Sequence, residues 1–362
     1  MKRVWSTYPA LLALIILAAT HTGCRKGPLP GDDQAAIRFS AGAAVISSAT
    51  DSKVAVVEHL STRDSLIKVG KQVAVYGSWA ASASVPNNAV TPVFSDETLT
   101  CTEVSGDVST WTYAPTRYWN HSGVYDFRAV FPARVPNVQG QPSRNHSGNG
   151  RQLVVDYSMH VDNYDMMVAH RRVTIGNAAP GTVDLSFKHA MSAICFQFIN
   201  GSGDPPSERY FLHAFETQNL RTVGLLQYQL EGDEDALLWQ TSEARAPQVW
   251  EWTAATPEES FEVTNDFEGL WYYAIPQGML SDDGLHPAIK FSFSVNSKTA
   301  DKIETTLLLP ETVTENNATT EVVWETGKKY KYTIRIQPNH TDITLQVRPW
   351  DKSFALVNDI VL

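Results

Sequence analysis

The chain has 362 residues, a formal net charge of −10 and three cysteines. An acidic chain without a cluster of Lys or Arg lacks the basic surface that nucleic acid requires, so we expect no nucleic-acid partner. Apart from Cys24, the cysteines are Cys101 and Cys195, too few for a disulfide-stapled small scaffold or a four-cysteine zinc site. For these two residues, one disulfide bond and two free thiols both remain open.

The first 23 residues have the pattern of a signal peptide. Lys2 and Arg3 give a positive start, residues 11–19 form an apolar run, and small residues lead to Gly23. The apolar run is too short to cross a bilayer, which needs about 20 residues. We therefore expect residues 1–23 to be removed.

Cys24 directly follows a small residue, as in a bacterial lipobox, where the cysteine sulfur is acylated and cleavage leaves that cysteine first. His21 departs from this pattern, because that position is usually apolar. An ordinary secretory signal with a chance cysteine is the alternative. The polar residues 24–35, which include glycines and prolines, are predicted to form a flexible tether between the lipid and the folded body.

The folded part alternates with period two, in short β-branched and aromatic runs separated by turn-forming residues. In residues 330–336, Tyr330 and Tyr332 point one way while Lys331 and Thr333 point the other, which predicts one buried and one wet face. No long segment has the three- and four-residue apolar spacing of a helix. The sequence therefore predicts an all-β fold made of β-sandwiches.

The best domain boundary is the turn-rich stretch at residues 176–181. We expect an N-terminal β-sandwich domain at residues 36–180 and a C-terminal one at residues 181–362. Residues 183–198 should then form a central part of the second domain. Within that segment, the side chains expected in its core are Leu185, Phe187 and Ile194.

Aromatic residues offer a second class of function, because flat apolar rings can stack on sugars. Two groups are dense: Trp111, Tyr113, Tyr118 and Trp119, and then Trp250, Trp252, Trp271, Tyr272 and Tyr273. Aromatics that alternate along strands more often fill a core. Exposure of several rings on one flat face would favour a monomeric glycan-binding lipoprotein of the outer membrane.

Catalytic signatures are missing from the sequence: there is no nucleophile elbow, zinc-protease helix, phosphate loop or calcium loop. Adjacent acids such as Asp282 and Asp283 stand in loop-like surroundings, where carboxylates are usually solvated. His189 is expected to be a structural hydrogen-bonding residue and not a metal ligand. We therefore expect that the chain is not an enzyme and that it binds neither a cofactor nor a metal ion.

Seven motifs follow one another along the chain, at residues 37–40 (IRFS), 69–77 (VGKQVAVYG), 111–119 (WTYAPTRYW), 125–132 (YDFRAVFP), 165–169 (DMMVA), 183–192 (VDLSFKHAMS) and 324–330 (WETGKKY). Their order, behind a lipobox-like start, resembles the fimbrillin family of Bacteroidales, the subunits of lipoprotein-derived pili. The resemblance implies two β-sandwich domains of transthyretin-like topology in tandem.

The resemblance also implies a life cycle. Such subunits travel as lipoproteins to the outer membrane, where a trypsin-like protease cuts after an Arg or Lys and removes the first strand. The groove left behind accepts a strand from another subunit by β-augmentation. The chain is thus expected to be a structural or adhesive subunit of a cell-surface pilus, with other fimbrial subunits, the membrane and the protease as partners.

In this sequence the removable strand would lie at residues 37–46. Arg63 best matches the cut site and Lys53 is the competitor, although both fit the alternative of solvated loop cations equally well. The donor strand would be residues 342–347 or the carboxy-terminal stretch. The apolar positions of that stretch are Phe354, Leu356, Val357, Ile360 and Leu362. The family also contains tip and anchor subunits whose processing differs.

Overall fold

The computed structural model describes residues 35–43, 66, 68–105, 108–136, 142–143, 146–159, 164–176, 180–231, 234–266, 269–280, 284–315 and 318–350. Within these ranges nearly every regular element is a β-strand, and the short turns Asn87–Ala89 and Pro257–Glu259 are 3₁₀-helical. The all-β prediction is confirmed. Over the same residues, no helix has both the length and the apolar character needed to cross a membrane.

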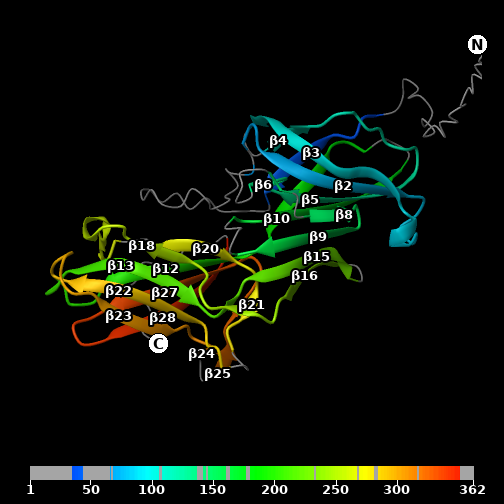
Figure 1. Ribbon diagram of the computed structural model, residues 1–362. Helices are drawn as coiled ribbons and strands as arrows, with labels where there is room; N and C mark the ends of the chain where they lie inside the picture. The colour runs from blue at the N-terminus through cyan, green and yellow to red at the C-terminus, as the bar shows by residue number, and fades with distance from the viewer. Residues whose placement is uncertain are drawn as a thin grey trace, which may run out of the picture. The chain divides into compact units, whose positions relative to one another are not determined.

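Seven strands close into a barrel, in the order β1-β11-β10-β5-β2-β3-β4, with β4 pairing back to β1 (Figure 1). Their bounds are β1 Phe39–Ala43, β2 Gln72–Ala80, β3 Thr91–Ser105, β4 Val108–Thr112, β5 Gly123–Phe131, β10 Met167–Ile175 and β11 Val183–His189. The inward side chains form one core, which includes Phe39, Phe94, Trp111, Phe127 and Leu185.

Two further sheets pack against each other in a sandwich. The first has the order β20-β12-β27-β28 and the second β18-β13-β22-β23, with β19 also pairing β13. Rings from the two sheets meet between them, as Phe198 and Phe291 do at 5.2 Å between centroids. The bounds are β12 Ser192–Asn200, β13 Tyr210–Gln218, β18 Glu251–Thr253, β19 Phe261–Glu262, β20 Leu270–Ala274, β22 Ala288–Val295, β23 Ile303–Leu308, β27 Lys328–Ile336 and β28 Thr341–Pro349.

A third sheet has the order β16-β15-β9-β8, with β8 His146–Asn149, β9 Gln152–Ser158, β15 Val223–Glu231 and β16 Glu234–Thr241. Its strands come from both sides of the expected domain boundary. The turn between β8 and β9 lies directly on the barrel, since a Cβ at Gly150 would come within 1.9 Å of the Asp126 carbonyl oxygen. The remaining strands form two-stranded pairs: β14 Leu220–Arg221 with β17 Arg245–Ala246, β21 Gln277–Gly278 with β26 Val323–Trp324, β24 Thr312–Glu315 with β25 Ala318–Glu321, and β6 Val135–Pro136 with β7 Pro142–Ser143.

The strand pairing changes the expected role of residues 183–198. Leu185 and Phe187 are buried as expected, but in the barrel core, because β11 pairs with β1 and β10. Ile194 is buried in the sandwich core, because β12 pairs with β20 and β27. The segment therefore contributes to both cores. The division of the chain at residues 180 and 181 into separate domains stays a prediction.

The face of residues 330–336 that was predicted to meet water is buried as well. Tyr330 and Tyr332 are buried in β27 as predicted, but Lys331 is only 9% exposed and Thr333 only 6%. Because β27 lies between β12 and β28, side chains of both neighbouring strands flank these two residues on the same face, with Gln197 and Thr344 on either side of Thr333. The Thr333 hydroxyl, for example, bonds the Gln197 amide oxygen across the sheet at 3.4 Å.

Charged side chains join the barrel to the third sheet. Asp126 on β5 accepts hydrogen bonds of 2.7 Å from both Arg151 and Arg172. Burial alone would raise the pKa of Asp126, but hydrogen bonds from His170, Arg172 and Arg151 outweigh it and lower the pKa to about 2. A second carboxylate at this joint, that of Asp235 on β16, pairs with His170 at 2.9 Å.

Cys101 and Cys195 are both buried and are not joined by a disulfide bond, which decides between the alternatives left open by the sequence. Cys101 lies in the barrel core, where burial raises the pKa of its thiol and the backbone hydrogen bond to Glu103 partly offsets this. Neither thiol therefore contributes a covalent link to the fold.

Candidate functional site

The barrel closes only through β1, which fills the space between β11 and β4. It runs parallel to β11, from Phe39 opposite Val183 to Ala43 opposite Phe187. On its other side it pairs antiparallel with β4 at two positions only. Without β1, the barrel would have two unpaired strand edges, and backbone groups at a strand edge readily pair with another chain.

The inward side chains of β1 and the residue before it are almost fully buried. Ile37, Phe39 and Ala41 are each 1% exposed, whereas Arg38 between them is exposed. The Phe39 ring makes edge-to-face contacts with three rings, at 5.4 Å to Phe94, 5.4 Å to Phe127 and 5.8 Å to Tyr113. Such contacts stabilise aromatic pairs beyond their buried area. The seat of β1 is therefore an aromatic pocket with a small-residue position beside it.

Two side-chain hydroxyls hold the backbone of this segment. The Ser109 hydroxyl donates to the Ala41 carbonyl oxygen at 2.8 Å and accepts from the Trp111 indole N–H at 2.7 Å. The Tyr113 hydroxyl donates to the Ile37 carbonyl oxygen at 2.8 Å. Because these hydrogen bonds are made to main-chain atoms, any strand with a suitable pattern of side chains could bind in the same place.

The expected first strand thus corresponds to β1 together with Ile37, and the residues after Ala43 lie outside the described part of the chain. The sequence did not identify the residues that form its seat. Their only signal is the alternation of apolar side chains in three separate strands, which does not reveal that those strands meet. Phe94, Ser109, Tyr113 and Phe127 are therefore additions from the structure.

The aromatic groups considered for sugar binding mostly fill the cores. Trp111 and Trp119 are 4% and 2% exposed, and Trp250 and Tyr273 are also buried. Among the nine rings of the two groups, Tyr118 alone is exposed, at 40%. No flat aromatic face therefore forms from these nine residues, and this removes the observation that would favour glycan binding.

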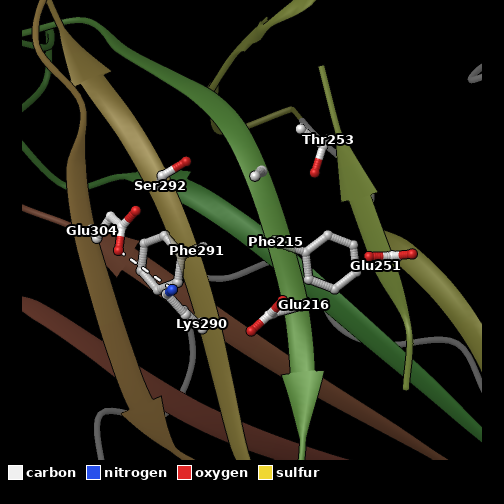
Figure 2. Close-up of a pocket in the computed structure, with 9 residues that line it drawn as sticks. Phe215, Glu216, Glu251, Thr253, Lys290, Phe291, Ser292 and Glu304 are labelled. Atoms are coloured by element: carbon white, nitrogen blue, oxygen red, sulfur yellow. Dashed lines mark ion pairs between the residues drawn. The ribbon is translucent and has the colours of Figure 1, made fainter. Parts of the chain in front are cut away.

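A shallow hollow of about 90 Å³ lies on the outer face of the sheet formed by β18, β13, β22 and β23 (Figure 2). The hollow exists because the small side chain of Ala214 is surrounded by longer ones. Its polar lining is Glu216, Glu251, Thr253, Lys290, Ser292 and Glu304. The Lys290 ammonium already pairs with Glu304 at 3.4 Å. The lining of the hollow contains neither histidine nor cysteine.

The described residues hold no group of three or more His, Cys, Asp or Glu side chains arranged to bind a metal ion. His189, as expected, makes a structural hydrogen bond: its Nδ1 lies 2.6 Å from the Asp165 carboxylate. The predicted lipidation, cleavage and donor-strand residues lie outside the described residues, and these are Cys24, Lys53, Arg63, Phe354, Leu356, Val357, Ile360 and Leu362.

Comparison with known proteins places the chain in a family. The fimbrillin-like family model matches residues 60–350, most of the sequence, so the chain belongs to the fimbrillin-like family. No curated protein matches the sequence. The match confirms the resemblance that the seven motifs indicated.

Several solved structures are distantly similar. A proposed cell adhesion protein from Bacteroides uniformis is 15% identical, with 87% of this chain and 99% of that chain covered and a TM-score of 0.48. A fimbrial protein from Bacteroides vulgatus is 13% identical, with 77% and 92% covered and a TM-score of 0.47. A fimbrial assembly protein from Parabacteroides distasonis is 10% identical, with 88% and 100% covered and a TM-score of 0.38. The family assignment rests on the family model and not on these similarities.

Proposed function

We propose that this chain is a structural or adhesive subunit of a bacterial cell-surface pilus, without enzymatic activity, that assembles by strand exchange after loss of its first strand. The observation that carries the proposal is the seat of β1. A five-residue strand closes the barrel and, with Ile37, supplies three fully buried side chains to its core. Membership in the fimbrillin-like family supports the same reading.

The physical basis is the loss of both packing and hydrogen bonds when β1 leaves. Phe94, Tyr113 and Phe127 would lose their common aromatic neighbour, and the edges of β11 and β4 would be exposed. Water can satisfy the backbone groups, but it cannot replace the apolar contacts. A strand from another subunit restores both, so polymerisation recovers the folding free energy that cleavage removes.

The seat specifies a pattern for the incoming strand. Reading along β1, the inward positions are a large apolar residue at 37, an aromatic residue at 39 and a small residue at 41. In the carboxy-terminal stretch, Phe354 can take the aromatic position, whereas Lys352 and Leu356 differ from the large apolar and small residues at the positions before and after it. Residues 342–347 are the weaker candidate, because they lie within β28, which pairs with β27 along its whole length.

Limited trypsin treatment tests the assembly. Cleavage at Arg63 or Lys53 should release the first strand and convert monomers into oligomers, observed by mass spectrometry and light scattering. The double variant Arg63→Ala, Lys53→Ala is the matched control and should stay monomeric under the same treatment. Deletion of residues 354–362 should leave cleavage intact and impair assembly. If the wild-type protein loses its first strand, retains residues 353–362 by mass spectrometry and stays monomeric, the stalk role is wrong.

Delivery to the outer membrane is the second part of the proposal and depends on Cys24. Cys24→Ser should prevent acylation and leave the protein soluble or unprocessed, as read by palmitate labelling and membrane fractionation. The matched control is Cys101→Ser, which removes a buried thiol and leaves the amino terminus intact. Normal labelling of the Cys24→Ser protein would overturn the lipid anchor.

A further inference from the structure

The two walls of the β1 seat are held in the barrel in different ways. On one side, β4 pairs with β3 along its whole length. On the other side, β11 pairs with β10 only through Lys188 and His189, at its carboxy-terminal end. In the described part of the chain, residues 183–187 have no neighbouring strand other than β1. One wall is therefore fixed by a complete ladder, whereas most of the other depends on β1 for its backbone pairing.

The backbone hydrogen bonds of β11 follow the same division. The Val183 N–H donates to the carbonyl oxygen of the residue before β1, at 2.7 Å. Because successive N–H groups of a strand point in opposite directions, the amides of Leu185 and Phe187 also face β1. The Ala190 N–H instead donates to the carbonyl oxygen of the residue before β10, at 2.8 Å. The amides of β11 and of Ala190 thus report two different contacts.

The carboxy-terminal end of β11 is held by side chains as well. The carbonyl oxygen of Ala190 accepts a hydrogen bond from the indole N–H of Trp239 on β16, at 2.9 Å. The Nδ1 of His189 lies 2.6 Å from the carboxylate of Asp165, which is fully buried. Neither Trp239 nor Asp165 belongs to β1 or to its aromatic pocket. This end of β11 is therefore held independently of β1.

The rest of β11 has water on one side. Its inward side chains belong to the same core as Phe39, whereas its outward side chains, Asp184 and Ser186, are exposed. The Asp184 carboxylate also accepts a hydrogen bond from the Ser40 hydroxyl on β1, at 3.2 Å. Loss of β1 would thus remove the ladder, this side-chain bond and part of the apolar packing together. A segment with so few remaining contacts is expected to open locally.

We propose that β11 is a hinged wall of the β1 seat: residues 188–190 stay fixed, and residues 183–187 move outward when β1 is absent or weakly held. Trp239 and Asp165 are the positioning residues of the hinge, because they hold the fixed end. The hinge deepens the proposed function and rests on it for its consequence in assembly. An incoming strand would bind first along β4, whose ladder with β3 is complete, and would then draw β11 back into place.

Residue-resolved hydrogen exchange in the full mature chain tests the hinge, with the amides of Leu185, Phe187 and Ala190 as reporters. Phe39→Ala weakens the hold on β1 and should accelerate exchange at Leu185 and Phe187 by roughly tenfold or more. Exchange at Ala190 should stay within about twofold of the wild-type rate, because its hydrogen bonds do not involve β1. Phe198→Ala removes a ring buried in the sandwich and is the matched control, which should not accelerate Leu185 relative to Ala190.

A second variant tests the fixed end. Trp239→Phe keeps a ring but removes the indole N–H, so it should accelerate exchange at Ala190 by roughly fivefold and leave Leu185 unchanged while β1 is in place. Trp252→Phe changes another partly buried indole and should alter neither rate. Equal acceleration of Leu185 and Ala190 in the Phe39→Ala protein would overturn the hinge. Unchanged exchange at Leu185 in that protein would overturn it as well.

A synthetic peptide with the sequence of residues 35–43 separates failure of the hinge from failure of the proposed function. The peptide is added in excess to protein that has been cut after Arg63 and freed of its first strand. Binding should restore slow exchange at Leu185 and Phe187, and the Trp239→Phe protein should need a higher peptide concentration. Slow exchange at both amides before the peptide is added would overturn the hinge. If Phe39→Ala gives the expected exchange but the peptide does not bind, the hinge stands and strand exchange is rejected.

Discussion

The barrel and the sandwich of this chain bury similar side chains but differ in how they are closed. The barrel is sealed by β1, a five-residue strand whose partners are β11 and β4. The sandwich keeps open edges at β28 and β23 and buries its core between longer strands such as β12, β13 and β27. The closure of the barrel therefore depends on a single short strand, while the packing of the sandwich is distributed over many strands. The comparison explains why strand loss would act on the barrel.

The largest expected effect tests this dependence directly. Phe39→Ala should lower the free energy of unfolding by about 3–5 kcal/mol, because it removes a fully buried ring and leaves a cavity among three aromatic neighbours. Phe198→Ala in the sandwich is the matched control and should cost a similar amount. The two variants should differ in hydrogen exchange, with only Phe39→Ala exposing the amides of β11 and β4. Equal exchange there in both proteins would show that β1 does not close the barrel independently.

A second pair of variants separates the two cores within one segment. Leu185→Ala and Ile194→Ala should each cost about 2–5 kcal/mol, since both leucine and isoleucine are fully buried. Hydrogen exchange should show loss of protection in the barrel for Leu185→Ala and in β20 and β27 for Ile194→Ala. A negligible shift of the melting midpoint for Leu185→Ala would place β11 on the surface.

The barrel and the third sheet are joined by charged residues, unlike the two apolar cores. The contribution of this joint to stability should therefore depend on pH. The pKa of Asp126 is lowered from 3.8 to about 2, so the native state gains stability above pH 4 and loses it as the pH falls towards 2. The loss across that window should be about 2 kcal/mol. Urea unfolding at pH 5 and pH 2 measures it, and Asp126→Asn should flatten the dependence. An unchanged slope in Asp126→Asn would assign the acid sensitivity to other carboxylates.

The smallest effect concerns the hydroxyl that holds the β1 segment. Tyr113→Phe removes the hydrogen bond to the Ile37 carbonyl oxygen and a longer one from the Arg117 backbone N–H, and should cost about 1 kcal/mol. Tyr330→Phe removes a comparable bond to Val323 in the sandwich and serves as the control. Only Tyr113→Phe should accelerate exchange of the Ile37 and Phe39 amides. Identical exchange in the two variants would mean that the hydrogen bond from the Tyr113 hydroxyl does not stabilise the position of β1.

Part of this organisation could be predicted from the sequence. Period-two alternation indicated the all-β fold and the apolar face of the first strand, because alternation directly reports which side chains point inward. Pairing between distant strands could not be predicted in the same way. Nothing local shows that β11 stands beside β1, or that β9 joins β15 across the expected boundary.

The burial of charged residues also could not be predicted from the sequence. In residues 125–129, Asp126 and Arg128 alternate with Tyr125 and Phe127, a pattern typical of one wet and one dry face. Both charged residues are nevertheless buried, at 1% and 0% exposure, because the third sheet covers the outer face of β5. Whether a polar face meets water or another sheet is decided by tertiary contacts, which alternation does not encode.

The pairing of β9 with β15 has a mechanical consequence. Along the chain β9 precedes the barrel strand β10, while β15 comes between sandwich strands, yet the two are hydrogen-bonded from Gln152 opposite Gln229 to Ser158 opposite Val223. A force that pulls the barrel away from the sandwich must therefore break a complete strand ladder before the connecting segments extend. In a fibre under tension, each such subunit would behave as a stiff element up to the force at which that ladder fails.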